Sequence, residues 1–144
     1  MNEAISRHFA TSGASRPRRV DNHRLSRRGG CAARRLRPAL GKHQHDDLVT
    51  PASVYAEILV APYRVGPKAV SEVDSFLSDF GIRIEPITAS IARTAARLRS
   101  ERKDVRLPDA FVLAVGDDVE ADVILTGDES WSKLSKRVIV IVGR

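Results

Sequence analysis

The chain has 144 residues, of which 42% are hydrophobic and 29% charged, and its formal net charge is +6 at neutral pH. This length predicts one domain, because single hydrophobic cores typically span about 100–200 residues. No apolar run approaches the ~20 residues that cross a bilayer, so we expect no membrane-spanning protein. The single cysteine, Cys31, excludes an intramolecular disulfide and a clustered-cysteine zinc site, and it fits a reducing, cytoplasmic compartment.

The positive charge is concentrated in the first third of the chain. Residues 1–46 hold 11 lysines and arginines against three acids, a net charge of +8, whereas residues 47–144 hold 13 against 15, a net charge of −2. Apolar residues in the first segment are too sparse to predict an element that faces a core. We therefore expect a basic, disordered or aberrant segment at 1–46 and a folded domain at 47–144.

Three interpretations of the basic segment stay open. Arginine-rich arms bind phosphates and fold on nucleic acid. An arginine-rich, acid-poor composition with serines is also typical of organellar transit peptides. In addition, Arg, Ala, Gly and Pro make up about half of residues 1–41, as expected of a GC-rich gene read from a wrong start or in a shifted frame.

From Leu48 onward, β-like and helical patterns alternate. The sequence predicts a strand at 48–50, helices at 51–61 and 69–80, a strand at 82–87, helices that begin at Thr88 and Pro108, and strands at 121–126 and 138–142. Pro62 predicts the end of the first of these helices, and Gly81 the end of the second. This alternation predicts a three-layer α/β domain with a central parallel sheet.

Three carboxylates stand out by their context. Glu57 lies inside an apolar helical stretch, Asp109 lies in the first turn of a helix, and Asp128 follows a predicted buried strand across one glycine. Sites in parallel α/β sheets form at the carboxyl edge of the strands. Carboxylates that converge there would bind Mg²⁺ or Mn²⁺, which generate hydroxide from water and neutralise charge on a reacting phosphodiester.

Each of these acids also has a structural interpretation. Glu57 can lie on the solvent face of its helix, and Asp109 can stabilise its helix through the dipole by about 0.3–1 kcal/mol. Asp128 can cap a short turn at 130–134. For Trp131 we expect a lid on the edge of the core, with base stacking as the alternative.

The stretches Leu48–Pro51 and Tyr55–Glu57, then Leu107–Phe111 and Leu125–Asp128, resemble the later motifs of PIN-domain ribonucleases, and most closely those of VapC toxins of bacterial toxin–antitoxin pairs. The resemblance covers about residues 47–142, and its three acids are spaced by 52 and 19 residues. It implies an Mg²⁺-dependent endoribonuclease, with Mn²⁺ as an alternative metal, that cuts RNA such as tRNA or ribosomal RNA. It also implies a cognate antitoxin that silences the enzyme and a homodimeric assembly.

Within this resemblance, Glu57, Asp109 and Asp128 match the catalytic and metal-binding acids. The family opens with an apolar strand that ends in an aspartate, the first metal ligand, in the middle of the sheet. No such segment stands in residues 1–46, so we expect the first strand to be missing or degenerate. Asp21 precedes Glu57 by 36 residues, a suitable distance for that ligand, but its neighbours do not form a buried strand. The alternative function is therefore a non-catalytic, degenerate PIN module that binds antitoxin or RNA.

Overall fold

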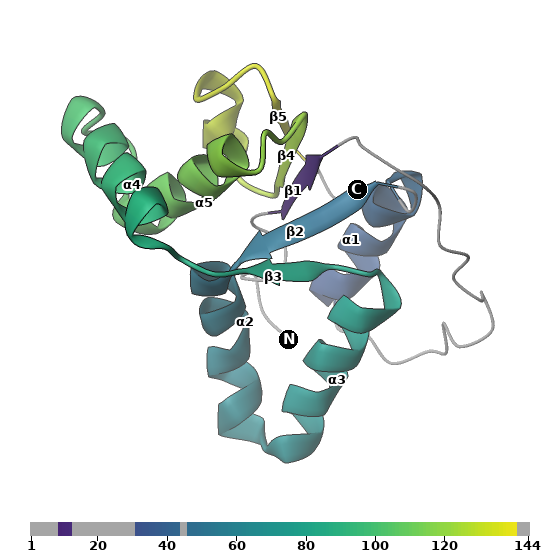
Figure 1. Cartoon of the computed structure of the whole chain (residues 1–144). Coiled ribbons are helices and arrows are strands. Elements are labelled where there is room, and N and C mark those ends of the chain that lie inside the picture. The colour runs from purple at the N-terminus through teal and green to yellow at the C-terminus, as the bar shows by residue number, and fades with distance from the viewer. Residues whose placement is uncertain (1–8, 13–30, 44–45, 141–144) are drawn as a thin grey trace.

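The structure is a computed structural model that describes residues 9–12, 31–43 and 46–140, with side chains described from residue 37 onward. Its elements are β1 (Phe9–Ser12), α1 (Cys31–Lys42), β2 (Asp47–Pro51), α2 (Ala52–Val65), α3 (Pro67–Asp79), β3 (Arg83–Glu85), α4 (Ala89–Glu101), α5 (Leu107–Asp118), β4 (Val123–Thr126), the 3₁₀ helix η3 (Glu129–Lys133) and β5 (Val138–Val140) (Figure 1). The α/β class predicted from the sequence is therefore confirmed. None of the helices described is long and apolar enough to cross a membrane.

The five strands form one sheet in the order β3-β2-β1-β4-β5. The outer pairs β2–β3 and β4–β5 are parallel, whereas β1 runs antiparallel to both β2 and β4. Since β2 and β4 both run against β1, the four strands other than β1 share one direction. The carboxyl ends of β2 and β4 consequently lie at the same edge of the sheet.

In the PIN resemblance the first strand lies in the middle of the sheet, and the sequence predicts that this strand is missing or degenerate. The structure fills this position with β1, a strand of only four residues whose sequence, FATS, contains no aspartate. In its register, Ala10 lies opposite Val49 on one side and Ile124 on the other. The central position is thus occupied, but by a short strand of opposite direction that supplies no acid.

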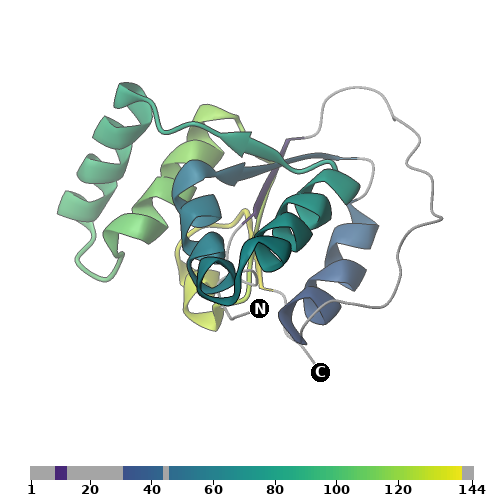
Figure 2. The same ribbon diagram turned by 90° about the horizontal axis from the view of Figure 1, so that it is seen from below.

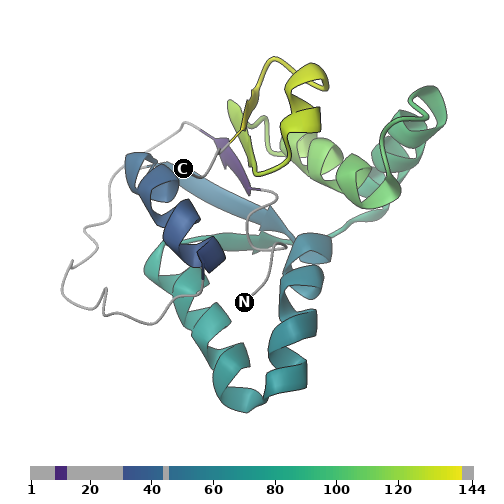
Figure 3. The same cartoon turned by 180° about the vertical axis from the view of Figure 1, so that it is seen from behind.

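Helix α1 lies beside α3, as Figures 1 and 3 both show. Leu40 of α1 is completely buried in the main hydrophobic core. The Arg37 guanidinium lies 5.8 Å and 5.9 Å from the ring centroids of Phe76 and Phe80 on α3, within cation–π range. The expectation that the apolar residues of 1–46 are too sparse for an element that faces the core is therefore wrong for α1, since Leu40 packs into the core and Arg37 contacts two rings of α3. The domain boundary at residue 46 stays a prediction.

Helix α2 continues beyond the proline that was predicted to end it. Pro62 removes one helical hydrogen bond, but its ring is buried, and the helix runs on to Val65. The Gly66 N–H donates to the Pro62 carbonyl at 2.9 Å, and Gly66 has a φ of 137°, a conformation that favours glycine. The chain then turns directly into α3, and Figure 2 shows α2 and α3 side by side.

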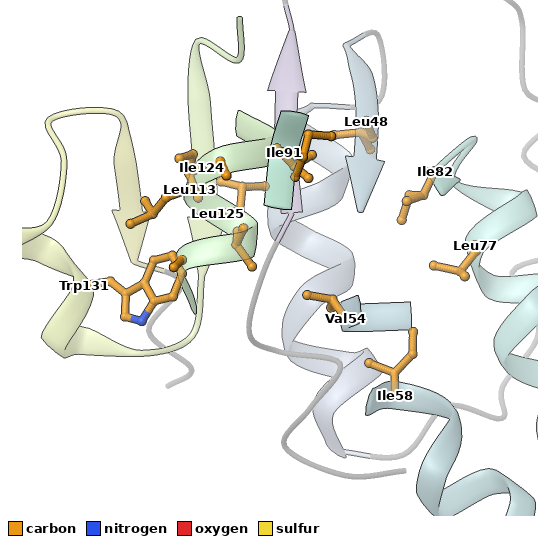
Figure 4. Packing of buried hydrophobic residues seen from close by; sticks show 14 of the residues in the cluster. Leu48, Val54, Ile58, Leu77, Ile82, Ile91, Leu113, Ile124, Leu125 and Trp131 are labelled. Atoms are coloured by element: carbon orange, nitrogen blue, oxygen red, sulfur yellow. The ribbon is translucent and has the colours of Figure 1, made fainter. Parts of the chain in front are cut away.

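The core is continuous from the α2–α3 pair to the C-terminal strands. Figure 4 shows Trp131, Leu113 and Leu125 gathered at one end of it, and Leu77 and Ile82 at the other. The Trp131 side chain is only 1% exposed. Base stacking by this ring is therefore excluded, and it seals the end of the core, as the main interpretation predicted.

The contribution of α1 to the fold is testable at Leu40. We expect Leu40→Ala to lower the free energy of unfolding by about 2–5 kcal/mol, because truncation of a buried leucine loses its transfer energy and leaves a cavity. The same change at Leu107, which is 45% exposed, is the matched control and should cost no more than about 0.5 kcal/mol. Equal effects of the two substitutions in urea unfolding would contradict the docking of α1.

Candidate functional site

Asp109 is the third residue of α5, and its carboxylate binds a backbone N–H at the N-terminus of that helix. Arg106 is the N-cap residue and makes no side-chain capping bond, and a proline stands in the first turn. The Asp109 carboxylate accepts a hydrogen bond from the backbone N–H of Arg106. This is one half of a capping box, in which the third helical residue satisfies the N–H of the cap. Asp109 thus satisfies one N–H at the start of α5, and this bond also fixes the direction of its carboxylate. The net stabilisation by charge that the dipole interpretation predicts is outweighed by the burial and repulsion described next.

The pKa of Asp109 is raised above its ordinary value of 3.8. The largest cause is partial burial, which disfavours the charged form; the negative charges of Asp128 and Glu57 add to it. The Arg106 N–H and guanidinium act in the opposite direction and do not balance them. The structure therefore brings all three predicted acids into one electrostatic neighbourhood, although they come from three different elements.

Asp128 stands one glycine after the end of β4 and caps η3. Its Oδ1 accepts hydrogen bonds from the Ser130 N–H at 2.9 Å and the Ser130 hydroxyl at 2.7 Å. Its own N–H donates to Thr126 Oγ1 at 3.1 Å. The predicted cap is confirmed, and these bonds hold an exposed carboxylate in a defined position at the carboxyl edge of the sheet.

Glu57 is exposed, as the structural interpretation expected. Four residues before it on α2 lies Ser53, so the two residues share one helix face. The Ser53 Oγ and Thr50 Oγ1 atoms are buried and have no hydrogen-bond partner within the described part of the chain. An unpaired buried hydroxyl costs about 1–3 kcal/mol, so these two groups are unfavourable to the fold as they stand. Sequence reasoning missed them; the spacing of Ser53 from Glu57 was the available signal.

The three acids suit a metal ion by their chemistry but not by their grouping in this structure. Mg²⁺ and Mn²⁺ prefer carboxylate and other oxygen ligands, so three carboxylates are suitable donors by their chemistry. Among the residues described, however, no three His, Cys, Asp or Glu side chains are grouped closely enough to hold one ion. Charges interact over about 10 Å, whereas ligation needs oxygens within about 2–2.6 Å of the ion. Asp21, the candidate for the first ligand, lies outside the described residues.

Comparison with known families identifies the class of protein. The PIN domain family matches residues 26–137. This range is well over half of the chain, which therefore belongs to the PIN domain family. The resemblance to PIN domains inferred from the four sequence stretches is thereby confirmed, and the match also includes α1, which those stretches did not reach.

A solved structure supports the fold. A chain from a structure described as a toxin–antitoxin complex from Klebsiella pneumoniae superimposes with a TM-score of 0.54 at 21% sequence identity, covering 65% of this chain and 73% of that one. At this identity the likeness concerns the fold alone. No curated protein sequence matches the chain.

The ionised carboxylate of Asp109 lowers the stability of the fold. Since its pKa is raised above 3.8, the folded chain binds this proton more tightly than the unfolded chain does, and stability falls as the pH rises from 3.8 through the folded-state pKa. Asp109→Asn keeps an oxygen for the Arg106 N–H but removes the charge. We expect the variant to be more stable than the parent at neutral pH and the difference to vanish below pH 3.8.

Urea unfolding across this pH range measures the effect. The matched control is Asp118→Asn, at an exposed aspartate near the other end of the same helix, which should not reproduce it. An Asp109→Asn protein that is less stable than the parent at neutral pH would contradict the repulsion inferred for this group.

Proposed function

We propose that this PIN domain protein is a VapC-like toxin of a type II toxin–antitoxin pair and acts as a metal-dependent endoribonuclease. The observation that carries the proposal is the convergence of Glu57, Asp109 and Asp128 from α2, α5 and the end of β4. The negative charges of Glu57 and Asp128 raise the pKa of Asp109, so the ionised form of Asp109 is unfavourable to the fold. An acid whose pKa is raised by burial and by neighbouring acids is typical of functional sites, including sites that bind a cation.

In this proposal Glu57, Asp109 and Asp128 would draw together around Mg²⁺ or Mn²⁺, and the ion would activate water and neutralise charge on the phosphodiester. The Arg106 N–H orients the Asp109 carboxylate, and the Ser130 groups orient that of Asp128. Glu57 is exposed and reaches the same neighbourhood from α2. In the hydrolysis proposed, the oxygen of one water would bond to phosphorus while the bond from phosphorus to the 3′ oxygen breaks. One proton of that water would end on the 3′ oxygen, so the products would be a 3′-hydroxyl and a 5′-phosphate.

The partners proposed with this function are a cognate antitoxin, an RNA substrate such as tRNA or ribosomal RNA, and a second copy of the chain, all in the cytoplasm. The toxin–antitoxin complex whose chain shares the fold supports the antitoxin as a partner. The PIN domain itself supports the nuclease class.

A second candidate function is a non-catalytic PIN module that binds antitoxin or RNA. It is favoured by the sequence of β1, which contains no acid, and by the lack of a three-ligand group in the part of the chain described. Co-purification with a co-expressed antitoxin, together with no RNA cleavage and no toxicity on expression, would favour this candidate over the nuclease.

RNA cleavage tests the leading proposal. We expect the full chain to cut RNA in Mg²⁺ or Mn²⁺ and Asp109→Asn to lower the rate at least about 100-fold, since loss of even an outer group of a metal site costs about 10–100-fold. Asp118→Asn, about 14 Å along the helix axis from Asp109, should retain the parent rate. Cleavage by Asp109→Asn at the parent rate would refute the assignment.

Metal binding gives a readout that does not depend on activity. Mg²⁺ or Mn²⁺ at 100 times its Kd should raise the free energy of unfolding of the parent chain by about 2.7 kcal/mol, because the ion binds only the folded state. Asp109→Asn should lose most of this stabilisation, whereas Asp118→Asn should keep it. Equal stabilisation of all three proteins would place the metal elsewhere.

A further inference from the structure

The domain that carries the acids is not uniform in charge. Residues 89–106, which form α4 and the loop before α5, contain six basic and two acidic residues, a net charge of +4. The remainder of residues 47–144 contains seven basic and 13 acidic residues, a net charge of −6. A strongly basic segment therefore adjoins the acidic site within a domain that is slightly acidic as a whole.

Most of these cations are exposed and available. The exposed members are Arg93, Arg97, Arg99, Lys103 and Arg106, which we term the α4–α5 basic surface. Within the described residues, the ion pairs do not involve Arg93, Arg97, Arg99 or Lys103, whereas the Arg106 guanidinium acts on the Asp109 carboxylate through its charge. Since the segment carries a net charge of +4, these cations create a positive potential that attracts a polyanion.

The sixth cation, Arg102, has a different role. It donates to the Leu134 carbonyl at 3.0 Å and pairs with Asp104 at 3.6 Å, and its carbonyl accepts a bond from Arg99. These contacts tie the α4–α5 loop to the segment after η3. The basic surface is therefore carried on an anchored loop and not on a free end.

The position of this surface relative to the site follows from the helix pair. Ile91 and Ala95 are the buried face of α4, and Arg93 and Arg97, four residues apart, share a face directed away from it. Figures 1 and 2 show α4 at the outside of the molecule beside α5. The end of α4 is joined through residues 102–106 to the first turn of α5, which contains Asp109.

We propose that the α4–α5 basic surface binds the phosphate backbone of RNA and leads the strand to Asp109. The surface supplies affinity without reading bases, because exposed arginines and lysines contact phosphates by charge. It offsets the repulsion that the acidic site exerts on a polyanion. The identity of the polyanion as substrate rests on the proposed ribonuclease function, whereas the binding surface itself does not.

The test is the salt dependence of RNA binding by the full chain. A fluorescently labelled single-stranded RNA oligonucleotide is titrated in EDTA, which prevents metal-dependent cleavage, at a series of salt concentrations. For Arg93→Gln with Arg97→Gln we expect the slope of log affinity against log salt to fall by about 1.4, because each phosphate contact on a single strand contributes about 0.7. This change corresponds to about 25-fold weaker binding at 0.1 M salt.

Two double variants remove the same charge elsewhere. Arg64→Gln with Lys68→Gln changes exposed residues around the α2–α3 turn, and Arg18→Gln with Arg19→Gln changes the basic N-terminal segment. Neither should lower the slope as much as the α4 variant does. An unchanged slope for the α4 variant, or equal losses in all three, would overturn the proposal. Thermal unfolding checks that each variant is folded.

Cleavage by the parent chain in Mg²⁺ tests the ribonuclease function separately. RNA binding that depends on Arg93 and Arg97, without cleavage, would support the surface and refute the nuclease. Cleavage with binding that is independent of these arginines would refute the surface and leave the nuclease standing.

Discussion

The burial of α5 is the constraint on which the site depends. Its Ala110, Val112 and Val115 side chains are fully buried, and the helix contacts α4, α2 and the middle of the sheet. At its far end, Gly116 approaches β4 so closely that a Cβ atom would lie 3.0 Å from the Ile124 side chain. A helix held on so many sides cannot shift without opening the core. Asp109, in its first turn, is therefore presented at a fixed position beside the end of β4.

This fixed position has a cost, because the carboxylates of the site repel one another. Burial and two neighbouring acids raise the pKa of Asp109, so its ionised form weakens the fold at neutral pH. Proteins commonly keep such unfavourable groups where function needs them. The basic surface on α4 bears the opposite charge and is joined to this site through the loop that contains Arg106. The acidic site is suited to a cation, and the α4–α5 basic surface is suited to a polyanion.

The candidate site was predictable in its residue types but not in its geometry. Glu57, Asp109 and Asp128 stood out because each follows or interrupts an apolar segment, and that signal is local. Their mutual influence depends on how α2, α5 and β4 pack, which no single segment contains. The unpaired hydroxyls of Thr50 and Ser53 were missed for the same reason, since a serine in sequence does not reveal whether its oxygen finds a partner.

The sequence by itself determined the elements whose signals act within a few residues. The Thr88 hydroxyl accepts from the Ile91 N–H at 3.2 Å, as its place before a helix predicted, and Asp128 caps η3 in the same way. Only the tertiary structure decided that Leu40 is buried and that α2 continues past Pro62. It also decided that β1 fills the middle of the sheet against the direction of its neighbours. Capping bonds close within one turn of chain, whereas burial and strand pairing gain their energy from residues far away in the sequence.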